Sequence, residues 1–390
     1  MIDEVIGGTK LGFWKSNLNP VVPDFNFYSD NMHKNFKNID KVVFGRGSFS
    51  EMEGILAEKR NDNDHFFLFV VDQYFEGKDL AKRIPAATND VVRFIDVDPH
   101  EPTTDQIDQL RDEILAGHGL PAGVIGIGGG SIMDIAKAVS LMFTNEGSST
   151  LYQGLNLIKK PGIYHLGVPT ISGTGAEVSM TAVLTGPVKK LGLKCDWTVF
   201  NQVILDPELI ASVPVDKWLY TGMDTYIHCI ESENGIKNNA YSHAFADQAL
   251  KLCREIYLGD KAGQTAENDE KLMVASMMGG LSLTYSEVGV CHAMSYGLSK
   301  IFGEKHCYAN CLVFQHLDEF YGEGVRELKQ MLVRHNISLP QGLSKNWSDA
   351  EITAMAEVAY NLPFMWHHAI GDNWKEKVNI DFIKDLYKRL

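Results

Sequence analysis

The chain has 390 residues, of which 45% are hydrophobic and 22% are charged, a balance typical of a globular protein. This length exceeds what a single hydrophobic core usually spans, so we expect two domains. The formal net charge of −14 argues against a general nucleic-acid surface or a surface for anionic membranes. The same charge repels small anions at long range, so an acidic substrate would need a local basic patch.

Signals for export and for membrane insertion are missing from the sequence. Asp3 and Glu4 precede no apolar run, which is unlike a secretory signal. The longest apolar stretch, at 66–71, is far too short for a membrane span. Six cysteines without a C-x-x-C pair fit no disulfide framework. We therefore expect a cytoplasmic protein with free thiols.

The first half of the sequence alternates strand-like with helix-like segments, which predicts a mostly parallel sheet. Helical segments are expected up to about residue 60 and up to about residue 116. Strands are expected at the apolar runs 41–44, 66–71, 91–97, 123–127 and 164–168.

The character of the sequence changes near Asp206-Pro207. Strand-like runs stop there, and apolar residues then recur at helical spacing. The residue before a proline is disfavoured in a helix, so this dipeptide is a natural boundary. We predict an α/β domain over residues 1–206 and an all-helical domain over residues 207–390.

The strongest local motif is Gly128-Gly129-Gly130-Ser131, which joins the predicted strand at 123–127 to an amphipathic helix. Glycines let the backbone approach a pyrophosphate, and the N–H groups at the start of the helix then face the anion. The alternative is a tight turn in which Ser131 caps the helix and Asp134 completes a capping box. Three consecutive glycines exceed what a cap needs, so we favour a phosphate-binding loop.

Two further positions in the first half suit a bound dinucleotide. The segment 169–177 follows a strand and combines glycines with hydroxyl side chains, which is typical of a ligand crevice but also of an ordinary polar loop. Asp72 ends another predicted strand, where an acid can accept hydrogen bonds from an adenosine ribose and would disfavour a 2′-phosphate. The alternative for Asp72 is a cap on the next helix. The ribose interpretation favours NAD over NADP.

Acidic and imidazole side chains in the second half have spacings that suit a metal site. Asp224 and His228 are four residues apart and share one face of a helix. His292 and His306 flank Gly303, where one helix should end before another begins near His306. One carboxylate and three neutral imidazoles suit Zn²⁺ or Fe²⁺.

The alternative for these histidines is that they are ordinary core or surface residues. Cys229, Cys291 and Cys307 each lie next to one of them in the sequence. Neighbouring helical residues point about 100° apart, so a cysteine and its adjacent histidine do not easily share an ion. We interpret these thiols as small buried apolar side chains.

Four motifs in this order resemble the iron-containing alcohol dehydrogenases. They are Gly-Gly-Gly-Ser-x-x-Asp-x-Ala-Lys, Pro-Thr-x-x-Gly-Thr-Gly-Ala-Glu, Gly-x-Asp-x-x-x-His and two spaced histidines. The resemblance implies a dehydroquinate synthase-like fold. That fold has an N-terminal dinucleotide-binding parallel-sheet domain, a C-terminal helical metal-binding domain and an active cleft between them.

The resemblance also implies residue roles. The four ligands of one divalent metal, Fe²⁺ or Zn²⁺, fall on Asp224, His228, His292 and His306. Residues implied to bind NAD or NADP are Asp72, Gly128, Gly129, Gly130, Ser131, Asp134, Lys137, Thr170, Thr174 and Lys194.

One position departs from the family pattern. Many members have a second histidine four residues after the third ligand, often assigned to proton transfer, and this chain has Tyr296 there. We include Tyr296 among the catalytic candidates because a phenol can also relay a proton.

Within the family, the chain resembles most the branch that oxidises the C8 hydroxyl of 3-deoxy-D-manno-octulosonate (KDO). An aminotransferase can convert that product to an 8-amino sugar acid for lipopolysaccharide. The implied reaction takes a primary alcohol to an aldehyde, with hydride transfer to NAD(P). Alternatives are an oxygen-using alcohol oxidase, a dehydrogenase of another small alcohol or diol, and a lyase of the dehydroquinate synthase type. Family analogy also implies a homodimer.

Overall fold

The computed structural model describes residues 37–60, 66–97 and 101–390. The first 36 residues of the predicted N-terminal domain therefore lie outside the described part. None of the described helices is long and apolar enough to cross a membrane.

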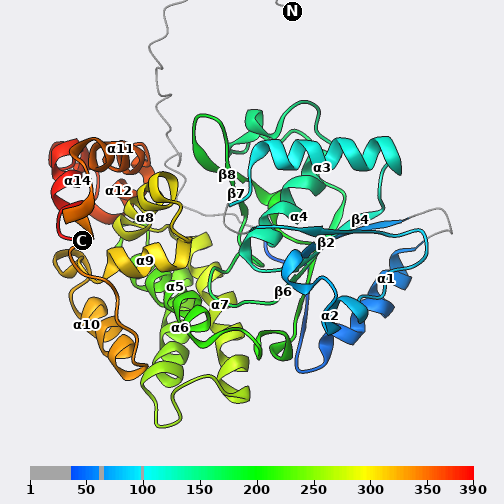
Figure 1. The fold of residues 1–390 in the computed structure, drawn as a ribbon, viewed down its shortest axis with the longest axis horizontal. Helices are drawn as coiled ribbons and strands as arrows, with labels where there is room; N and C mark the ends of the chain where they lie inside the picture. The colour runs from blue at the N-terminus through cyan, green and yellow to red at the C-terminus, as the bar shows by residue number, and fades with distance from the viewer. Residues whose placement is uncertain (1–36, 61–65, 98–100) are drawn as a thin grey trace, which may run out of the picture. The chain divides into compact units, whose positions relative to one another are not determined.

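Six parallel strands form the main sheet, in the order β1-β9-β6-β4-β2-β3 (Figure 1). The five predicted strands are all present in it, and a sixth follows at Gln202–Leu205. The strands are β1 Lys41–Phe44, β2 Phe67–Asp72, β3 Val91–Ile95, β4 Gly123–Gly128, β6 Tyr164–Pro169 and β9 Gln202–Leu205.

Helices cover both faces of this sheet, so its central strands are buried on both sides. Along β2, Leu68 and Val70 pack into one apolar core, while Phe67 and Phe69 pack into the core on the opposite face. Gly126 of β4 lies against a helix, where an added Cβ would be 2.7 Å from the Cβ of Ala136. The helices of this half are α1 Met52–Lys59, α2 Asp79–Lys82, α3 Thr104–Gly117 and α4 Gly130–Met142.

A small second sheet was not predicted from the sequence. Its order is β5-β8-β7, and β7 pairs with β8 as an antiparallel hairpin. The strands are β5 Gly154–Leu155, β7 Thr181–Thr185 and β8 Lys190–Lys194. The sequence of β8 is KLGLK. Lysine and glycine are uncommon in strands, so this segment gives little strand signal.

Every regular element after β9 in the described residues is helical, as predicted (Figure 1). A separate apolar core fills this half. The helices are α5 Val215–Asn234, α6 Ala240–Leu258, α7 Ala266–Tyr285, α8 Val290–Phe302, α9 His306–Phe314, α10 Asp318–Arg334, α11 Asp349–Tyr360, α12 Pro363–Ile370, α13 Trp374–Lys377 and α14 Ile380–Tyr387. Short 3₁₀ helices lie at Ser48–Glu51, Gln73–Phe75, Ser149–Tyr152, Asp196–Thr198, Pro207–Ile210 and Leu343–Asn346.

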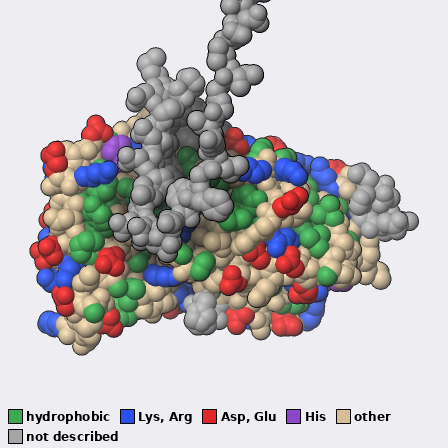
Figure 2. All heavy atoms as spheres, turned by 90° about the horizontal axis from the view of Figure 1, so that it is seen from above, with side chains coloured by type: hydrophobic (Ala, Val, Ile, Leu, Met, Phe, Trp, Pro, Cys, Tyr) green, Lys and Arg blue, Asp and Glu red, His purple; other side chains and the backbone are tan. Residues whose placement is uncertain are grey.

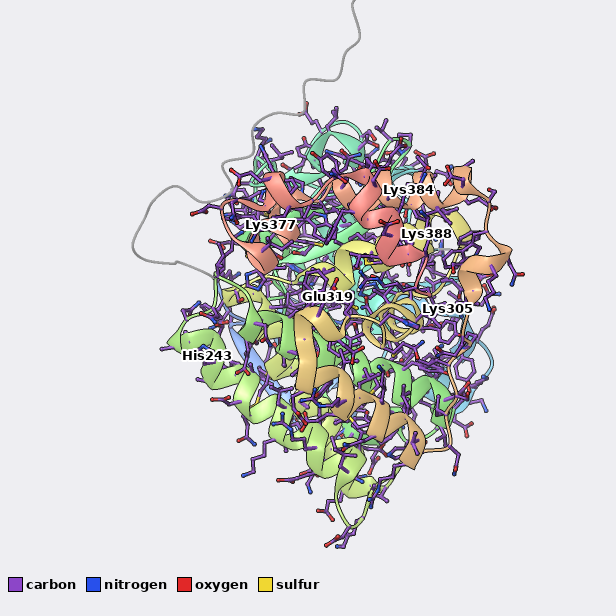
Figure 3. The ribbon with its side chains drawn as sticks, turned by 90° about the vertical axis from the view of Figure 1, so that its left-hand side faces the viewer. His243, Lys305, Glu319, Lys377, Lys384 and Lys388 are labelled. Atoms are coloured by element: carbon purple, nitrogen blue, oxygen red, sulfur yellow. The ribbon has the colours of Figure 1, made fainter. Side chains whose placement is uncertain are left out.

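Charged side chains occupy the surface in mixed signs, as Figure 2 shows for one face. In the helical half, Glu319 near the start of α10 (Figure 3) pairs with Arg389 at 3.1 Å. Exposed pairs of this kind contribute little to stability, about 0–1 kcal/mol. The fold therefore depends mainly on its buried cores.

The loop after β6 packs directly on the helical half. Thr225 Oγ1 donates a 2.8 Å hydrogen bond to the carbonyl of Gly173, and the N–H of Gly173 donates to Ser276 Oγ at 2.8 Å. Gly175 has φ +64°, and a Cβ there would be 2.4 Å from the Cα of Gly280 in α7. Glycine at 175 thus permits both the left-handed turn and the close backbone approach.

We predict that Gly175→Ala lowers the free energy of unfolding by about 2–4 kcal/mol, because overpacking adds to backbone strain. Gly77→Ala is the matched control, since Gly77 has φ +74° and no atom within 4 Å of an added Cβ. Urea denaturation of both variants measures the difference. Equal losses in the two variants would contradict the proposed contact between backbones.

Candidate active site

Four side chains from three helices converge in the helical half. Asp224 and His228 lie one turn apart on α5, His292 is in the first turn of α8, and His306 begins α9. One ligand atom from each of the four lies within 4.8 Å of the others. The Nε2 atoms of His228, His292 and His306 are 3.6, 3.6 and 3.8 Å from the carboxylate oxygens of Asp224.

A turn between two helices brings the last two histidines together. Helix α8 ends at Phe302 and is followed by Gly303 in the left-handed conformation, with φ +71°. Helix α9 then begins at His306, so the predicted helix end and helix start are confirmed. The rings of His292 and His306 lie 5.2 Å apart between centroids.

The charges in this cluster suit a divalent cation. Burial lowers the pKa of His228 to about 4 and that of His306 to about 3, so both rings are neutral at neutral pH. Burial acts to raise the pKa of Asp224, but the three imidazoles together bring it below its usual range. Asp224 has no exposed surface, and its only ion-pair partners among the described residues are these imidazoles.

Glu231, which sequence reasoning missed, is a second buried carboxylate beside the cluster. It accepts a hydrogen bond from His292 Nδ1, and also from the Cys291 N–H at 2.7 Å and the Tyr321 hydroxyl at 2.8 Å. Burial acts to lower the pKa of His292, but Glu231 and Asp224 outweigh it and raise the pKa to about 9. Without a metal, two buried carboxylates thus face one protonated imidazole; a bound divalent cation would displace that proton and balance the negative charge.

The side chain of Asn310 in α9 shows where the ligand lone pairs meet. Its amide nitrogen donates to Asp224 Oδ1 at 2.6 Å and lies 3.1 Å from His292 Nε2 and 3.2 Å from His306 Nε2. Three of the four candidate ligands therefore direct lone pairs to one place. The residues fit a metal ion on this ground, since imidazole nitrogens and a carboxylate oxygen are ligands of Zn²⁺ and Fe²⁺.

The interpretation of the three cysteines holds for two of them. Cys229 and Cys291 are both buried in the helical core. Cys307 differs, because its Sγ lies 3.5 Å from Asp224 Oδ2 and the residue is partly exposed. A thiol that points away from its neighbouring histidine can thus still contact the carboxylate of another helix.

The glycine motif lies at the carboxyl end of β4, as predicted. An added Cβ on Gly128 would be 2.6 Å from Ile132 Cγ1, and one on Gly130 would be 3.0 Å from Thr174 Oγ1. The first helical hydrogen bond of α4 runs from Met133 N to Gly129 O, so the N–H groups before it have no partner within the helix. Glycine thus permits close packing at positions 128 and 130, and the N–H groups without a helical partner at the start of α4 fit a pyrophosphate.

The capping alternative for this motif is not observed. The N-cap of α4 is Gly129, with no side-chain capping bond, so Ser131 does not cap the helix. Burial raises the pKa of Asp134 to about 7. The nearby ammonium group of Lys137 acts in the opposite direction but does not cancel this effect. Ser131 in the first turn of α4 and Asp134 just after that turn are both partly exposed.

The second loop lies beside the glycine motif. The Thr170 N–H donates to the Gly128 carbonyl at 2.9 Å, and Thr174 Oγ1 accepts from the Ala176 N–H at 3.2 Å. Asp72 ends β2, and its Cβ would be 3.1 Å from a Cβ on Gly128. Asp72 Oδ1 also accepts from the Tyr74 N–H at 2.9 Å, which is the capping contact considered as the alternative. The ribose role of Asp72 stays a prediction.

Lys137 occupies a different environment from the other residues of the cofactor set. Its side chain is fully buried, and its ammonium group donates to the carbonyls of Ala176, Ser179 and Thr181. These bonds attach α4 to the segment that leads into β7. They use the three N–H donors of the ammonium group, so they do not favour the predicted contact with a cofactor.

Tyr296 lies on α8 beside the histidine cluster. Its ring centroid is 5.7 Å from that of His306, and the ammonium nitrogen of Lys190 is 4.5 Å from the Tyr296 ring centroid. Burial, followed by nearby carboxylates, raises the pKa of Tyr296 above its usual range, so the phenol stays protonated. Lys194, at the end of β8, pairs with Glu287 at 3.4 Å.

A parallel-sheet half with a glycine loop, followed by a helical half that gathers three imidazoles and a carboxylate, defines a dehydroquinate synthase-like oxidoreductase fold. Two family models match the chain. The model described as iron-containing alcohol dehydrogenase matches residues 40–207, and the C-terminal model of the Fe-containing alcohol dehydrogenase family matches residues 218–364. The chain belongs to the iron-containing alcohol dehydrogenase family, whose members are alcohol or aldehyde oxidoreductases.

Individual relatives agree with this assignment. The NAD-dependent methanol dehydrogenase of Bacillus methanolicus is 30% identical over 290 residues, which cover 71% of this chain and 73% of that protein. The 1-propanol dehydrogenase PduQ of Citrobacter freundii is 27% identical over 314 residues, 76% of each chain.

Solved structures share the fold. The sulfoacetaldehyde reductase of Bifidobacterium kashiwanohense in complex with NAD+ has a TM-score of 0.75 and 22% identity, covering 91% of this chain and 98% of that one. The alcohol dehydrogenase of Oenococcus oeni has a TM-score of 0.78 and 19% identity, covering 91% of this chain and 100% of that one.

We predict that Glu231→Gln weakens metal binding about 10- to 100-fold, because a neutral amide orients and polarises the His292 ring less well than a carboxylate. Competition with a chelator, read out as bound metal per chain, measures this affinity. The control is Glu233→Gln on the same helix, whose carboxylate lies 3.2 Å from His243 Nδ1. Wild-type affinity in Glu231→Gln would contradict the role of Glu231.

Proposed function

We propose that this protein oxidises a primary alcohol to an aldehyde, and that its substrate is the C8 hydroxyl of KDO. In the proposed reaction, the alcohol carbon transfers a hydride to NAD or NADP, and we favour NAD. The observation that carries it is the convergence of Asp224, His228, His292 and His306, whose ligand atoms lie within 4.8 Å of one another.

These four residues would hold one divalent ion, Fe²⁺ or Zn²⁺. An ion bound there supplies Lewis acidity, which lowers the pKa of an alcohol and stabilises the alkoxide. The protein supports this chemistry through its own charges. His228 and His306 are neutral and need lose no proton to bind a cation, and Glu231 orients His292.

The carboxyl edge of the parallel sheet would hold the dinucleotide. NAD supplies the acceptor carbon for hydride, and its pyrophosphate would bind at Gly128–Ser131, where the start of α4 presents backbone N–H groups. The names of two relatives support NAD, since one is an NAD-dependent dehydrogenase and the other was solved with NAD+. Asp72 beside this loop suits a free ribose 2′-hydroxyl better than a 2′-phosphate.

Tyr296 is our candidate for moving the hydroxyl proton outward. Its ring lies next to His306, and its phenol stays protonated because burial opposes the charged form. A protonated phenol can pass a proton along a hydrogen-bonded chain without holding negative charge. A ribose hydroxyl or a water molecule would complete the relay.

The choice of substrate has one competitor within the family. Two relatives are named as dehydrogenases of methanol and of 1-propanol. Their names support a short alcohol as the alternative substrate of this protein. Polar side chains beside the candidate site, among them Glu101, Lys190 and Glu287, suit a polar, hydroxyl-rich substrate such as a sugar better than a short alcohol. An aldehyde at C8 would next serve an aminotransferase, and we infer action in the cytoplasm.

We predict that His292→Ala loses bound metal and at least about 1000-fold in kcat/KM, a loss of several kcal/mol in transition-state stabilisation. Dinucleotide binding should survive, because the glycine loop lies on another domain. Elemental analysis, steady-state kinetics and NAD titration measure the three quantities. His243→Ala on α6 (Figure 3) is the control, since His243 pairs with Glu233 outside the cluster. Full activity in metal-free His292→Ala would contradict the mechanism.

A substrate screen tests the reaction itself. Purified protein is assayed with KDO, methanol, 1-propanol and simple diols, each with NAD, NADP or oxygen as acceptor. We expect NADH formation with KDO and the highest kcat/KM for that substrate. Hydrogen peroxide formed without nicotinamide would identify an oxidase instead, and product formation with no net change in NAD would identify a lyase.

A further inference from the structure

Strand β8 presents two lysines toward the helical half. Lys190 and Lys194 are four residues apart, so both side chains lie on one face of the strand. Leu193 points to the other face and packs into the core of the sheet domain. The ammonium nitrogen of Lys190 lies 4.5 Å from the ring centroid of Tyr296, which fixes the direction of the lysine face. The Lys190 end of this face therefore borders the candidate site, and Lys194 lies further along the same strand.

Lys190 is held tightly by its neighbours. It forms an ion pair with Glu101 at 2.5 Å, and only 4% of its side chain is exposed. The Tyr296 ring covers it from the side of α8. A side chain enclosed in this way positions its surroundings and has little freedom to meet a ligand.

Lys194 has a looser environment. Its side chain is 23% exposed, and its ion pair with Glu287 is longer, at 3.4 Å. The pair reaches from the sheet domain to the connection between α7 and α8, where Glu287 lies five residues before the candidate ligand His292. An ammonium group has three donors, and this one has a single ion-pair partner among the described residues.

Glu287 can hold Lys194 in place for a ligand. Its side chain is buried, and its Oε1 accepts a 3.3 Å hydrogen bond from the Val288 N–H. Burial acts to raise the pKa of Glu287, but Lys194 and Lys237 outweigh it and keep the carboxylate ionised. A fixed carboxylate on one side of the ammonium group leaves the other side for a second anion.

We propose that Lys194 binds the carboxylate of an acidic substrate and thereby selects sugar acids over uncharged alcohols. This inference rests on the proposed oxidation of KDO, whose hydroxyl at one end would react while its carboxylate at the other end is held. A local cation is needed for such a substrate, because the net charge of −14 repels anions from the protein as a whole.

The sequence suggested another role for Lys194, contact with the cofactor. The two roles differ in what they do to substrate preference. Loss of a cofactor contact weakens turnover of every alcohol alike, whereas loss of a carboxylate contact weakens only turnover of acids. The ratio of kcat/KM for an acid to kcat/KM for its uncharged form therefore separates them, and general damage to the enzyme cancels from it.

The experiment measures this ratio with KDO and KDO methyl ester at saturating NAD. In Lys194→Met the ratio should fall about 10- to 100-fold, the effect of one charge-assisted hydrogen bond. Lys194→Arg, which keeps the charge, should retain most of the preference. The control is Lys189→Met from the same hairpin, whose ammonium group donates to the Gln153 carbonyl at 2.9 Å.

Two negative results have different meanings. An unchanged ratio in Lys194→Met, with wild-type enzyme that prefers the acid, would overturn the role of Lys194 and leave the proposed function standing. Wild-type enzyme that oxidises short alcohols but neither KDO nor its ester would overturn the proposed substrate and this inference together.

Discussion

The candidate site depends on compensation of the negative charge of two buried carboxylates. Asp224 and Glu231 lie on one helix with almost no exposed surface, and without a metal the compensating charge within the cluster is a proton on His292. A buried charge without a partner is costly, so this arrangement is stable only if a cation binds or a proton is held there. Helices α5, α8 and α9 pack so that their side chains meet at this point, and the reaction that we propose uses the cation that the site requires.

Much of this arrangement could be predicted from the sequence, because it follows from the spacing of residues that are close together in the chain. A four-residue interval puts Asp224 and His228 on one helix face, and Gly303 marks the turn that returns the chain to His306. The glycine run was equally readable, since only a close approach or an open helix start calls for three glycines. Apolar runs predicted five strands of the main sheet because buried parallel strands are continuously hydrophobic.

The rest depends on contacts between distant segments, for which local patterns give no signal. Glu231 looks like an ordinary helical acid until α8 places His292 against it, and Asn310 is notable only because α9 inserts its amide among the ligands. The hairpin that carries Lys194 has too little apolar periodicity to be read as strands. Lys137 is the converse case: its position near the glycine loop suggested a cofactor contact, which stays a prediction, and its buried hydrogen bonds to backbone carbonyls gave no local signal.

The central claim is that one divalent ion binds to this carboxylate and these three imidazoles. Anomalous X-ray diffraction from crystals of the purified protein, recorded on both sides of the iron and zinc absorption edges, tests it most directly. The account predicts a single strong anomalous peak within about 2.3 Å of Asp224 and of each of the three histidines. Electron density that shows a metal-free cluster in active protein, or an ion bound elsewhere, would contradict it.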